Sequence, residues 1–310
     1  MPTSILGLAH ALPPEQRVGS VSRPTVTEAM GPSELAVAPA HEALAKAGLA
    51  VGDIDLVAFA TMTPDVTFPG AACFFQHKMS AGTTAAVDLR GQCAGFITGL
   101  MVADAYLSAG VYRHVLLAAG EVHSSGLDTS PAGIDVAELY GDGAAVAVLG
   151  AGDGAGCESV VCHSDGREYD RFWIEYPASR QHPLRITVEN LREGKQYLKL
   201  DRERIAAFAL DKLPAVVREA CERAGASLAQ VDAFILSHIL PGVTERCAAS
   251  LGLTDDAWID AGAAHGHLTA ATLPVALSEA LASGRIARGA RVCLAACGAG
   301  ANWGAAVLRV

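Results

Sequence analysis

The chain has few charged and few aromatic residues for its length. Of its 310 residues, 18% are charged and 5% are aromatic, whereas 51% are hydrophobic. A chain with so little charge and so much apolar surface folds around an interior and does not stay disordered. The composition favours a layered α/β protein whose parallel strands are covered on both faces.

Basic residues are also in deficit. The sequence holds 23 Lys and Arg against 33 Asp and Glu, a formal net charge of -10. Nucleic-acid affinity comes mainly from clustered Lys and Arg that neutralise phosphates. We therefore exclude nucleic acid as a partner.

Long hydrophobic runs and paired cysteines are missing as well. No stretch approaches the roughly 18 apolar residues of a membrane span, and residues 1–14 lack the basic and apolar segments of a signal peptide. The eight cysteines form no C-x-x-C pair and lie at positions 73, 93, 157, 162, 221, 247, 293 and 297. Such spacing is typical of reduced thiols and not of disulfides or a zinc site. We expect a soluble, cytoplasmic protein with no membrane partner.

The sequence contains an internal repeat. Residues 47–60 and 224–237 share an Ala-Gly turn followed by an Asp-led apolar strand, at an offset of 177. Residues 114–119 and 291–296 resemble each other at the same offset. Chance would rarely supply one offset twice, so we interpret the chain as a duplicated unit.

Each copy alternates helices with apolar strands, which is the pattern of parallel βαβ units joined by right-handed crossovers. Residues 1–160 and 161–310 would then form one half each. Residues 94–109 are apolar on nearly every side of a helix. A helix of that kind is buried, and we expect it to lie between two sheets.

Two chemically interesting residues take similar places in the two halves. Aligning residues 107–110 with residues 281–284 gives an offset of 174 and places Cys93 opposite His267. Both would lie where a loop enters a helix. Sites in open parallel sheets form at the carboxyl ends of strands, so two such ends that face each other predict a shared pocket.

Cys93 is the candidate nucleophile. It directly precedes the expected buried helix, where unpaired backbone N–H groups and the helix dipole favour a thiolate. Gly91 and Gly95 flank it and permit close approach of the backbone. The alternative is that Cys93 is one more small buried residue.

Two histidines and a glycine-rich loop complete the candidate site. His238 follows an apolar strand directly, and His267 precedes a helix. His265 and His267 form a His-x-His pair, but no third ligand has suitable spacing, so we expect no metal. Residues 297–304 form a tight loop that could present a backbone N–H to an oxyanion, although a plain turn would have the same composition.

Taken in order, these segments resemble the ketoacyl-acyl-carrier-protein synthase III group of the thiolase superfamily. The matching segments are 68–73, the Cys93 segment, Tyr140-Gly-Asp-Gly-Ala, Ser237-His238, 266–277 and 298–304. The resemblance implies a thiolase-like fold, in which the duplicated βαβαβ-type halves form a layered αβαβα sandwich. It also implies that Cys93 carries an acyl group and that His238 is catalytic.

The resemblance has further implications for the site. The N–H groups of Cys93 and Ala299 would form the oxyanion hole, and His267 would act with His238 on the enolate of a malonyl thioester. Phe68 would reach across a homodimer to shape the partner's acyl pocket. No cofactor is implied.

The sequence departs from the family pattern at several points. The family usually has Asn where this chain has His267, and Ile239-Leu-Pro241 replaces a polar run. The segment that holds the adenine of coenzyme A is not recognisable between residues 11 and 33. The acyl donor would therefore be bound differently or arrive on an acyl carrier protein.

Two further segments suggest binding surfaces. Residues 167–180 are rich in large aromatics, among them Trp173 and Tyr176, and would cover the substrate pocket or pack as an ordinary surface loop. Lys195, Lys199 and Arg246 would form a local basic spot for an acidic carrier protein or simply a solvated face.

We thus predict an acyltransferase that loads an acyl group on Cys93 and condenses it with a malonyl thioester, in fatty acid or polyketide-type biosynthesis. The first alternative is an acyltransferase that moves the acyl group to a hydroxyl or amine, with His238 as general base. The second is a catalytically silent subunit of a larger synthase.

Overall fold

The computed structural model describes residues 3–152 and 156–310, and it contains two five-stranded sheets. The first sheet has the strand order β1 (Thr3–Ala11), β7 (Gly143–Ala151), β6 (His114–Glu121), β4 (Leu56–Ala60), β5 (Ala85–Leu89). The second has the order β12 (Trp258–Asp260), β11 (Ala233–Ser237), β13 (Arg291–Gly298), β14 (Asn302–Arg309), β8 (Cys157–Ser164). The two sheets have matching strand orders.

Each sheet is mixed. Strand β4 pairs in parallel with β5 and β6, whereas β7 pairs antiparallel with β6 and β1. The second sheet repeats this pattern, with β11 parallel to β12 and β13, and β14 antiparallel to β13 and β8. The interior strands β4 and β11 are buried along their whole length, which explains their predominantly apolar sequences.

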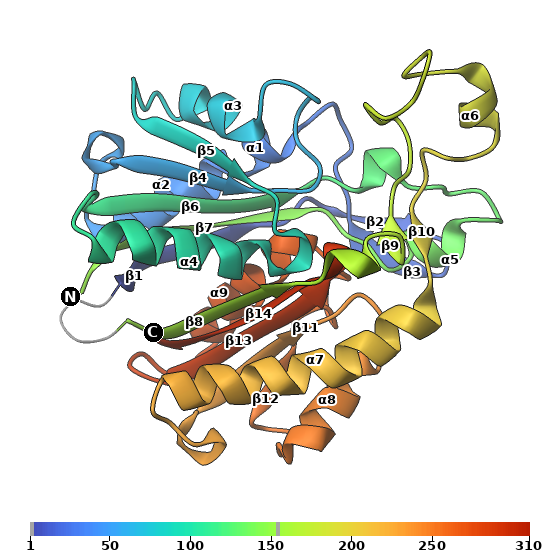
Figure 1. Cartoon of the computed structure of the whole chain (residues 1–310). Helices are drawn as coiled ribbons and strands as arrows, with labels where there is room; N and C mark the ends of the chain where they lie inside the picture. The colour runs from blue at the N-terminus through green and yellow to red at the C-terminus, as the bar shows by residue number, and fades with distance from the viewer. Residues whose placement is uncertain (1–2, 153–155) are drawn as a thin grey trace.

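Helices form the remaining three layers (Figure 1). The outer face of the first sheet is covered by α1 (Pro32–Leu35), α2 (Val37–Ala47) and α3 (Ala71–Lys78). Between the sheets lie α4 (Gly95–Ser108) and α9 (Thr272–Ala282), and beyond the second sheet lie α7 (Arg202–Arg223) and α8 (Val243–Leu251). This arrangement confirms the predicted αβαβα sandwich. Among the helices that the structure describes, none is both long and apolar enough to cross a membrane.

The remaining elements are short. Some lie at the end of the sandwich where the site forms, and others connect the layers. The strands are β2 (Glu15–Val18), β3 (Val21–Pro24), β9 (Phe172–Trp173) and β10 (Lys199–Leu200), and the short α-helices are α5 (Ile134–Ala137) and α6 (Val188–Arg192). The 3-10 turns are η1 (Val51–Asp53), η2 (Gln92–Ala94), η3 (Ser124–Gly126), η4 (Gly166–Glu168), η5 (Leu228–Gln230), η6 (Thr269–Ala271) and η7 (Ala299–Ala301).

The central helix α4 is buried mainly in its first half. Phe96, Ile97 and Leu100 have no more than 1% of their surface exposed, because the helix contacts strands of both sheets there. Met101 and Tyr106 are 40% and 41% exposed. The expectation of a helix buried on nearly every side therefore holds for its first turns and fails toward its end.

The repeat is visible in three dimensions. Strands β4 and β11 begin 177 residues apart (56 and 233), as do β6 and β13 (114 and 291). Asp55 accepts a hydrogen bond from the backbone N–H of Arg113 at 2.7 Å, and Asp232 accepts the equivalent bond from Arg291 at 2.8 Å. The Asp that precedes each strand thus joins it to its neighbour in the same way.

The same offset corrects the predicted partner of Cys93. The turns η2 and η6 also begin 177 residues apart (92 and 269), and each starts with a residue of positive φ, Gln92 and Thr269. The counterpart of Cys93 is therefore Ala270, and His267 lies three residues ahead of it. The offset of 174 came from aligning the helix ends, and α4 has 14 residues where α9 has 11.

The division into halves at residue 160 stays a prediction. The sheets themselves change over between the end of β7 at Ala151 and the start of β8 at Cys157. Strand β8 pairs with β14 along its length and so belongs to the second sheet.

Candidate active site

Cys93 lies in the turn η2 between β5 and α4, and 1% of its surface is exposed. Neighbouring atoms pack so closely around Cys93 that two nearby positions have room only for glycine. A Cβ atom on Gly298 would lie 2.2 Å from the Cys93 sulfur, and one on Gly95 would lie 2.9 Å from the Cβ of Ala270. The two halves of the chain therefore meet at the cysteine with no room for larger residues.

His267 is the side chain in direct contact with the cysteine. Its Nε2 lies 3.1 Å from the Cys93 Sγ. The backbone N–H of His267 donates to the carbonyl of Leu139 at 2.7 Å, and a parallel β-bridge joins His267 to Tyr140. The first half of the chain thus fixes a histidine that the second half supplies. Its Nδ1 is buried without a hydrogen-bond partner among the residues that the structure describes.

His238 directly follows β11, as the sequence predicts, and 5% of its surface is exposed. Its Nδ1 lies 3.1 Å from the backbone nitrogen of Leu240, whose N–H donates to it. A ring nitrogen that accepts a hydrogen bond carries no proton, so the proton of the neutral ring is on Nε2. Burial lowers the pKa of His238 to about 4, and the ring is neutral at neutral pH. His238 is therefore a hydrogen-bond donor through Nε2.

Burial favours the uncharged forms of both Cys93 and His267. Burial raises the pKa of the Cys93 thiol to about 12, although the backbone N–H groups of Ala299 and of Cys93 itself oppose the shift. Burial, and then the nearby His238 and His123, lower the pKa of His267 to about 3. Burial thus favours the thiol at rest, whereas the position before a helix favours the predicted thiolate. The motif shows a helix start but not how completely the sulfur is removed from water.

The glycine-rich loop after β13 lies beside the sulfur. Ala299 opens the turn η7, and its backbone N–H is directed at the Cys93 sulfur, as is the N–H of Cys93. Asn302 holds this loop by donating its side-chain N–H to the carbonyl of Ala299 at 2.9 Å. Gly300 has a φ of 123°, which favours glycine. The two N–H groups that the resemblance assigns to an oxyanion hole thus point to one place.

A large cavity opens on the cysteine. Its volume is about 760 Å³, within the range of small-molecule sites. Trp173 and Tyr176 line it together with Cys93, as the aromatic segment suggests. Phe68 does not line it and is 89% exposed on the loop between β4 and α3.

A buried carboxylate that the sequence did not reveal lies beneath the site. Glu121 ends β6 and has 0% of its surface exposed. It accepts hydrogen bonds from Thr61, Met62 and Thr63 in the loop after β4, and from the backbone N–H of Ala270. Burial raises its pKa to about 7. The sequence did contain an indication of this residue, because Glu121 stands at the carboxyl end of a strand that belongs to the repeat.

Asp142 is a second buried carboxylate that, like Glu121, accepts hydrogen bonds from a loop near the site. Its carboxylate accepts hydrogen bonds from the backbone N–H groups of His123 and Ser124 at 2.7 Å and 3.0 Å. The Nε2 of His123 lies 2.8 Å from the Thr269 Oγ1, which links the two halves again. Asp142 belongs to the Tyr-Gly-Asp-Gly motif, whose function the sequence alone did not reveal.

Other predicted residues lie apart from the cysteine. His265 contacts Glu279 on α9 at 2.8 Å, whereas His267 contacts Cys93. The two histidines of the His-x-His pair therefore have different partners. Lys195 forms an ion pair with Glu193 and Lys199 with Glu175, both at the protein surface. Arg246 is exposed on α8 and forms no ion pair with any residue that the structure describes.

This arrangement agrees with sequence relationships. Residues 87–166 match the family model 3-oxoacyl-[acyl-carrier-protein (ACP)] synthase III, and residues 221–310 match its C-terminal model. A β-ketoacyl-[acyl-carrier-protein] synthase III of Rhodospirillum centenum is 35% identical over 301 residues, which cover 95% of this chain and 88% of the relative. The chain belongs to the 3-oxoacyl-[acyl-carrier-protein] synthase III family. It is accordingly a ketosynthase III-like acyltransferase.

Solved structures of the family superpose on nearly the whole chain. The β-ketoacyl-[acyl carrier protein] synthase III of Thermus thermophilus is 27% identical, with a TM-score of 0.87 and coverage of 99% of both chains. The priming β-ketosynthase of the R1128 polyketide pathway is 26% identical, with a TM-score of 0.86 and coverage of 99% of this chain and 96% of that one. The similar structures thus include a priming ketosynthase of a polyketide pathway as well as synthases III.

Proposed function

We propose that this synthase condenses an acyl group, held as a thioester on Cys93, with a malonyl thioester. The observation that carries the proposal is the tautomer of His238. The Leu240 N–H donates to its Nδ1, so the neutral ring carries its proton on Nε2, where it would serve as a donor to the substrate. A donor suits the oxygen of an enolate. A general base for a hydroxyl or amine would need that nitrogen free, so the alternative of simple acyl transfer is less well supported.

Acyl loading uses Cys93 and His267. As the sulfur attacks the carbonyl carbon of the incoming thioester, its proton passes to the His267 Nε2, 3.1 Å away. The carbonyl oxygen becomes an oxyanion that accepts from the N–H groups of Cys93 and Ala299. When the C–S bond of the donor breaks, the leaving thiolate takes the proton from His267. Cys93 then holds the acyl group and both histidines are neutral again.

Condensation uses both histidines as donors. The bond between the carboxylate carbon and the α-carbon of the malonyl group breaks, carbon dioxide leaves, and the electron pair forms an enolate. Its oxygen accepts from the Nε2–H of His238 and, in the corresponding tautomer, from that of His267. The α-carbon attacks the acyl carbon, the C–S bond to Cys93 breaks, and the thiolate takes a proton from water, so that one proton is consumed and the thiol is restored.

Substrate delivery is part of the proposal. The names of the relatives specify an acyl carrier protein, and we extend this donor, or coenzyme A, to the present chain. Arg246 is the best placed of the predicted carrier contacts because it is exposed and pairs with no acidic group in the described part of the chain, whereas Lys195 and Lys199 are already paired. Trp173 and Tyr176, in the wall of the cavity, would contact the acyl chain.

Carbon dioxide release tests the reaction. The enzyme is first loaded from an acyl thioester and then mixed with malonyl thioester labelled in its carboxylate. We expect stoichiometric release of labelled carbon dioxide and a β-ketoacyl product. The control omits the acyl donor. Transfer of the acyl group to added alcohols or amines, with no label released from the malonyl thioester, would contradict the proposal.

A homodimer is the second part of the proposal. Phe68 exposes 89% of its surface in the loop before α3, and the start of α3 contacts Asp88 of the edge strand β5. A large exposed aromatic side chain beside an open sheet edge is a typical contact for a second copy. The partner's Phe68 would close the open side of the large cavity.

Sedimentation tests the dimer. We expect the protein to sediment at twice the mass of the chain, and Phe68→Asp to weaken association by at least about tenfold, because a buried aromatic side chain contributes about 2 kcal/mol. Val111→Asp is the matched control, since Val111 is 59% exposed on the turn between α4 and β6. A monomeric native protein would refute this part.

A further inference from the structure

A second, much smaller pocket lies next to the large cavity. Its free volume is about 20 Å³, enough for one water molecule. His238 lines it, and so does the loop of residues 297–301. The two cavities share Phe172, Ala299 and Gly300, so the small pocket adjoins the place where the predicted oxyanion forms.

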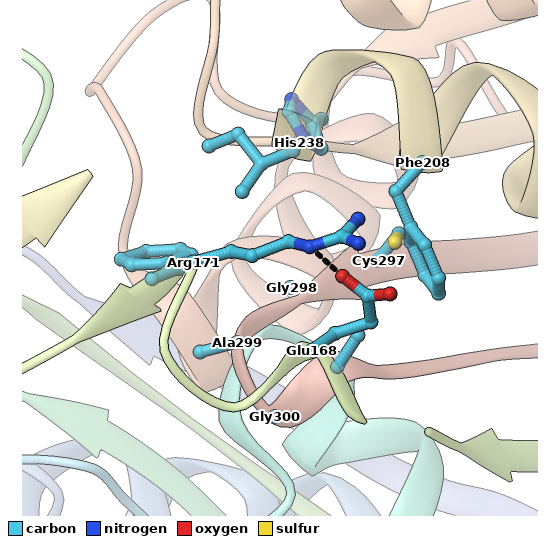
Figure 2. Close-up of a pocket in the computed structure, with 11 residues that line it drawn as sticks. Glu168, Arg171, Phe208, His238, Cys297, Gly298, Ala299 and Gly300 are labelled. Carbon is cyan, nitrogen blue, oxygen red and sulfur yellow. Dashed lines mark ion pairs between the residues drawn. The ribbon is translucent and has the colours of Figure 1, made fainter. Parts of the chain in front are cut away.

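An ion pair lines this pocket. Figure 2 shows the Arg171 side chain extending across it, with the Glu168 carboxylate on one side of the guanidinium and His238 on the other. The two side chains are mostly buried, with 21% exposed for Arg171 and 12% for Glu168. Phe208 and Ile205 on α7 give the pocket an apolar wall.

The loop that carries the pair is fixed to the catalytic loop. The backbone groups of Asp165 and Ala301 exchange two hydrogen bonds, of 2.9 Å and 3.0 Å. The carbonyl of Arg171 accepts from the backbone N–H of Asp201 at 2.8 Å. These hydrogen bonds fix both ends of the segment 165–171. They hold the ion pair beside Ala299 and His238.

Stability alone does not explain the pair. Removing a cation and an anion from water costs free energy that their attraction often fails to recover. Glu168 contacts the Nε of Arg171 and lies 4.0 Å from the Nη2 of Arg204, and no other acidic group among the described residues pairs with the Arg171 side chain. A guanidinium has five N–H donors arranged as a planar fork that fits a carboxylate. The remaining donors are available to an anion that enters from the site.

We propose that Arg171 recognises the carboxylate of the malonyl thioester, with Glu168 as the counter-ion that it leaves and to which it returns. This inference rests on the proposed condensation. The malonyl carboxylate is the one anion of that reaction that must lie beside the enolate donors, and His238 lines the same pocket as Arg171.

The reaction itself then breaks the contact. When the bond from the carboxylate carbon to the α-carbon cleaves, the negative charge moves to the enolate oxygen and neutral carbon dioxide is left. Arg171 has no further anion to bind and pairs with Glu168 again. Because the contact is stronger with the ground state than with the transition state, it improves binding of malonyl thioester without accelerating the chemical step.

Steady-state kinetics of Arg171→Gln test the inference. We expect the KM for malonyl thioester to rise about 10- to 100-fold, the loss of a charge-assisted hydrogen bond, while kcat does not fall and acyl loading of Cys93 is unchanged. Glu168→Gln should lower the KM, because it removes the competing carboxylate. Arg171→Lys should recover part of the binding. Arg167→Gln is the matched control, since Arg167 pairs with Asp165 on the same loop and is 87% exposed.

A charge-selectivity measurement completes the test. The native enzyme should bind malonyl thioester at least tenfold more tightly than the analogue with an amide in place of the carboxylate, and Arg171→Gln should lose this preference. An unchanged KM and preference in Arg171→Gln would overturn the inference, as would a fall in kcat and acyl loading with no change in KM. A native enzyme that condenses nothing with malonyl thioester would instead refute the proposed function.

Discussion

Replacing Cys93 with alanine is expected to lower formation of the β-ketoacyl product by at least about 10⁴-fold, as for the nucleophiles of other covalent enzymes. The thiol is the one nucleophile placed between the two N–H groups and His267, and no other described thiol contacts that histidine. The measurement is the product yield per enzyme under saturating acyl donor and malonyl thioester.

Cys247→Ala is the matched control for this loss. Cys247 is another buried cysteine, with 0% of its surface exposed and a pKa raised to about 11 by burial. It lies on α8, away from the cavity, and its replacement should leave most of the activity. Equal losses in the two variants would show that damage to the core, and not removal of the nucleophile, causes the effect.

His267 should control the rate of acyl loading and its dependence on pH. With a thiol pKa of about 12 and an imidazole pKa of about 3, both groups are neutral at working pH, and the imidazole is free to take the proton during attack. We expect His267→Ala to slow loading by about 10²- to 10⁴-fold, the range of general-base catalysis. The reason is that a thiolate would then have to form without an adjacent base.

The pH profile separates this role from a structural one. In His267→Asn the attacking thiolate arises only by ionisation, and its fraction rises tenfold for each pH unit below the thiol pKa. Loading by this variant should therefore increase steeply between about pH 6 and 9, whereas the native rate should be nearly flat, since His267 protonates only far below this range. Quenched-flow mass spectrometry measures both. Parallel profiles would contradict the role of His267.

Asparagine at this position should also separate the two half-reactions. An amide N–H donates to an enolate but cannot accept a proton from the thiol. Once His267→Asn has been loaded with acyl group, decarboxylation of malonyl thioester should proceed within a few-fold of the native rate. If the second step fell as far as the first, His267 would be required as more than a donor there.

Much of the fold could be predicted from the sequence because the duplication constrains it. Two repeated segments at one offset locate β4 with β11 and β6 with β13, and the Asp before each strand makes the same contact in both halves. The position of His238 at the end of β11 follows from that repeat. The place of Cys93 before a buried helix follows from the apolar pattern of α4.

Other parts depend on quantities that a linear pattern does not contain. The counterpart of Cys93 was misplaced because one central helix is longer than the other. The predicted thiolate rests on a helix start, and the motif does not show the depth of burial that raises the pKa of the sulfur. Arg171 and Glu168 lie in a segment whose aromatics drew attention first, and only the folded chain brings this pair to His238.

The proposed reaction depends on one chemical event, the transfer of an acyl group from a thioester to the sulfur of residue 93. Intact-mass spectrometry after incubation with an acyl thioester, followed by peptide mapping, observes it directly. We expect one acyl group per chain, located on the peptide that contains Cys93. An unmodified protein, or an adduct confined to the exposed Cys73, would contradict the account.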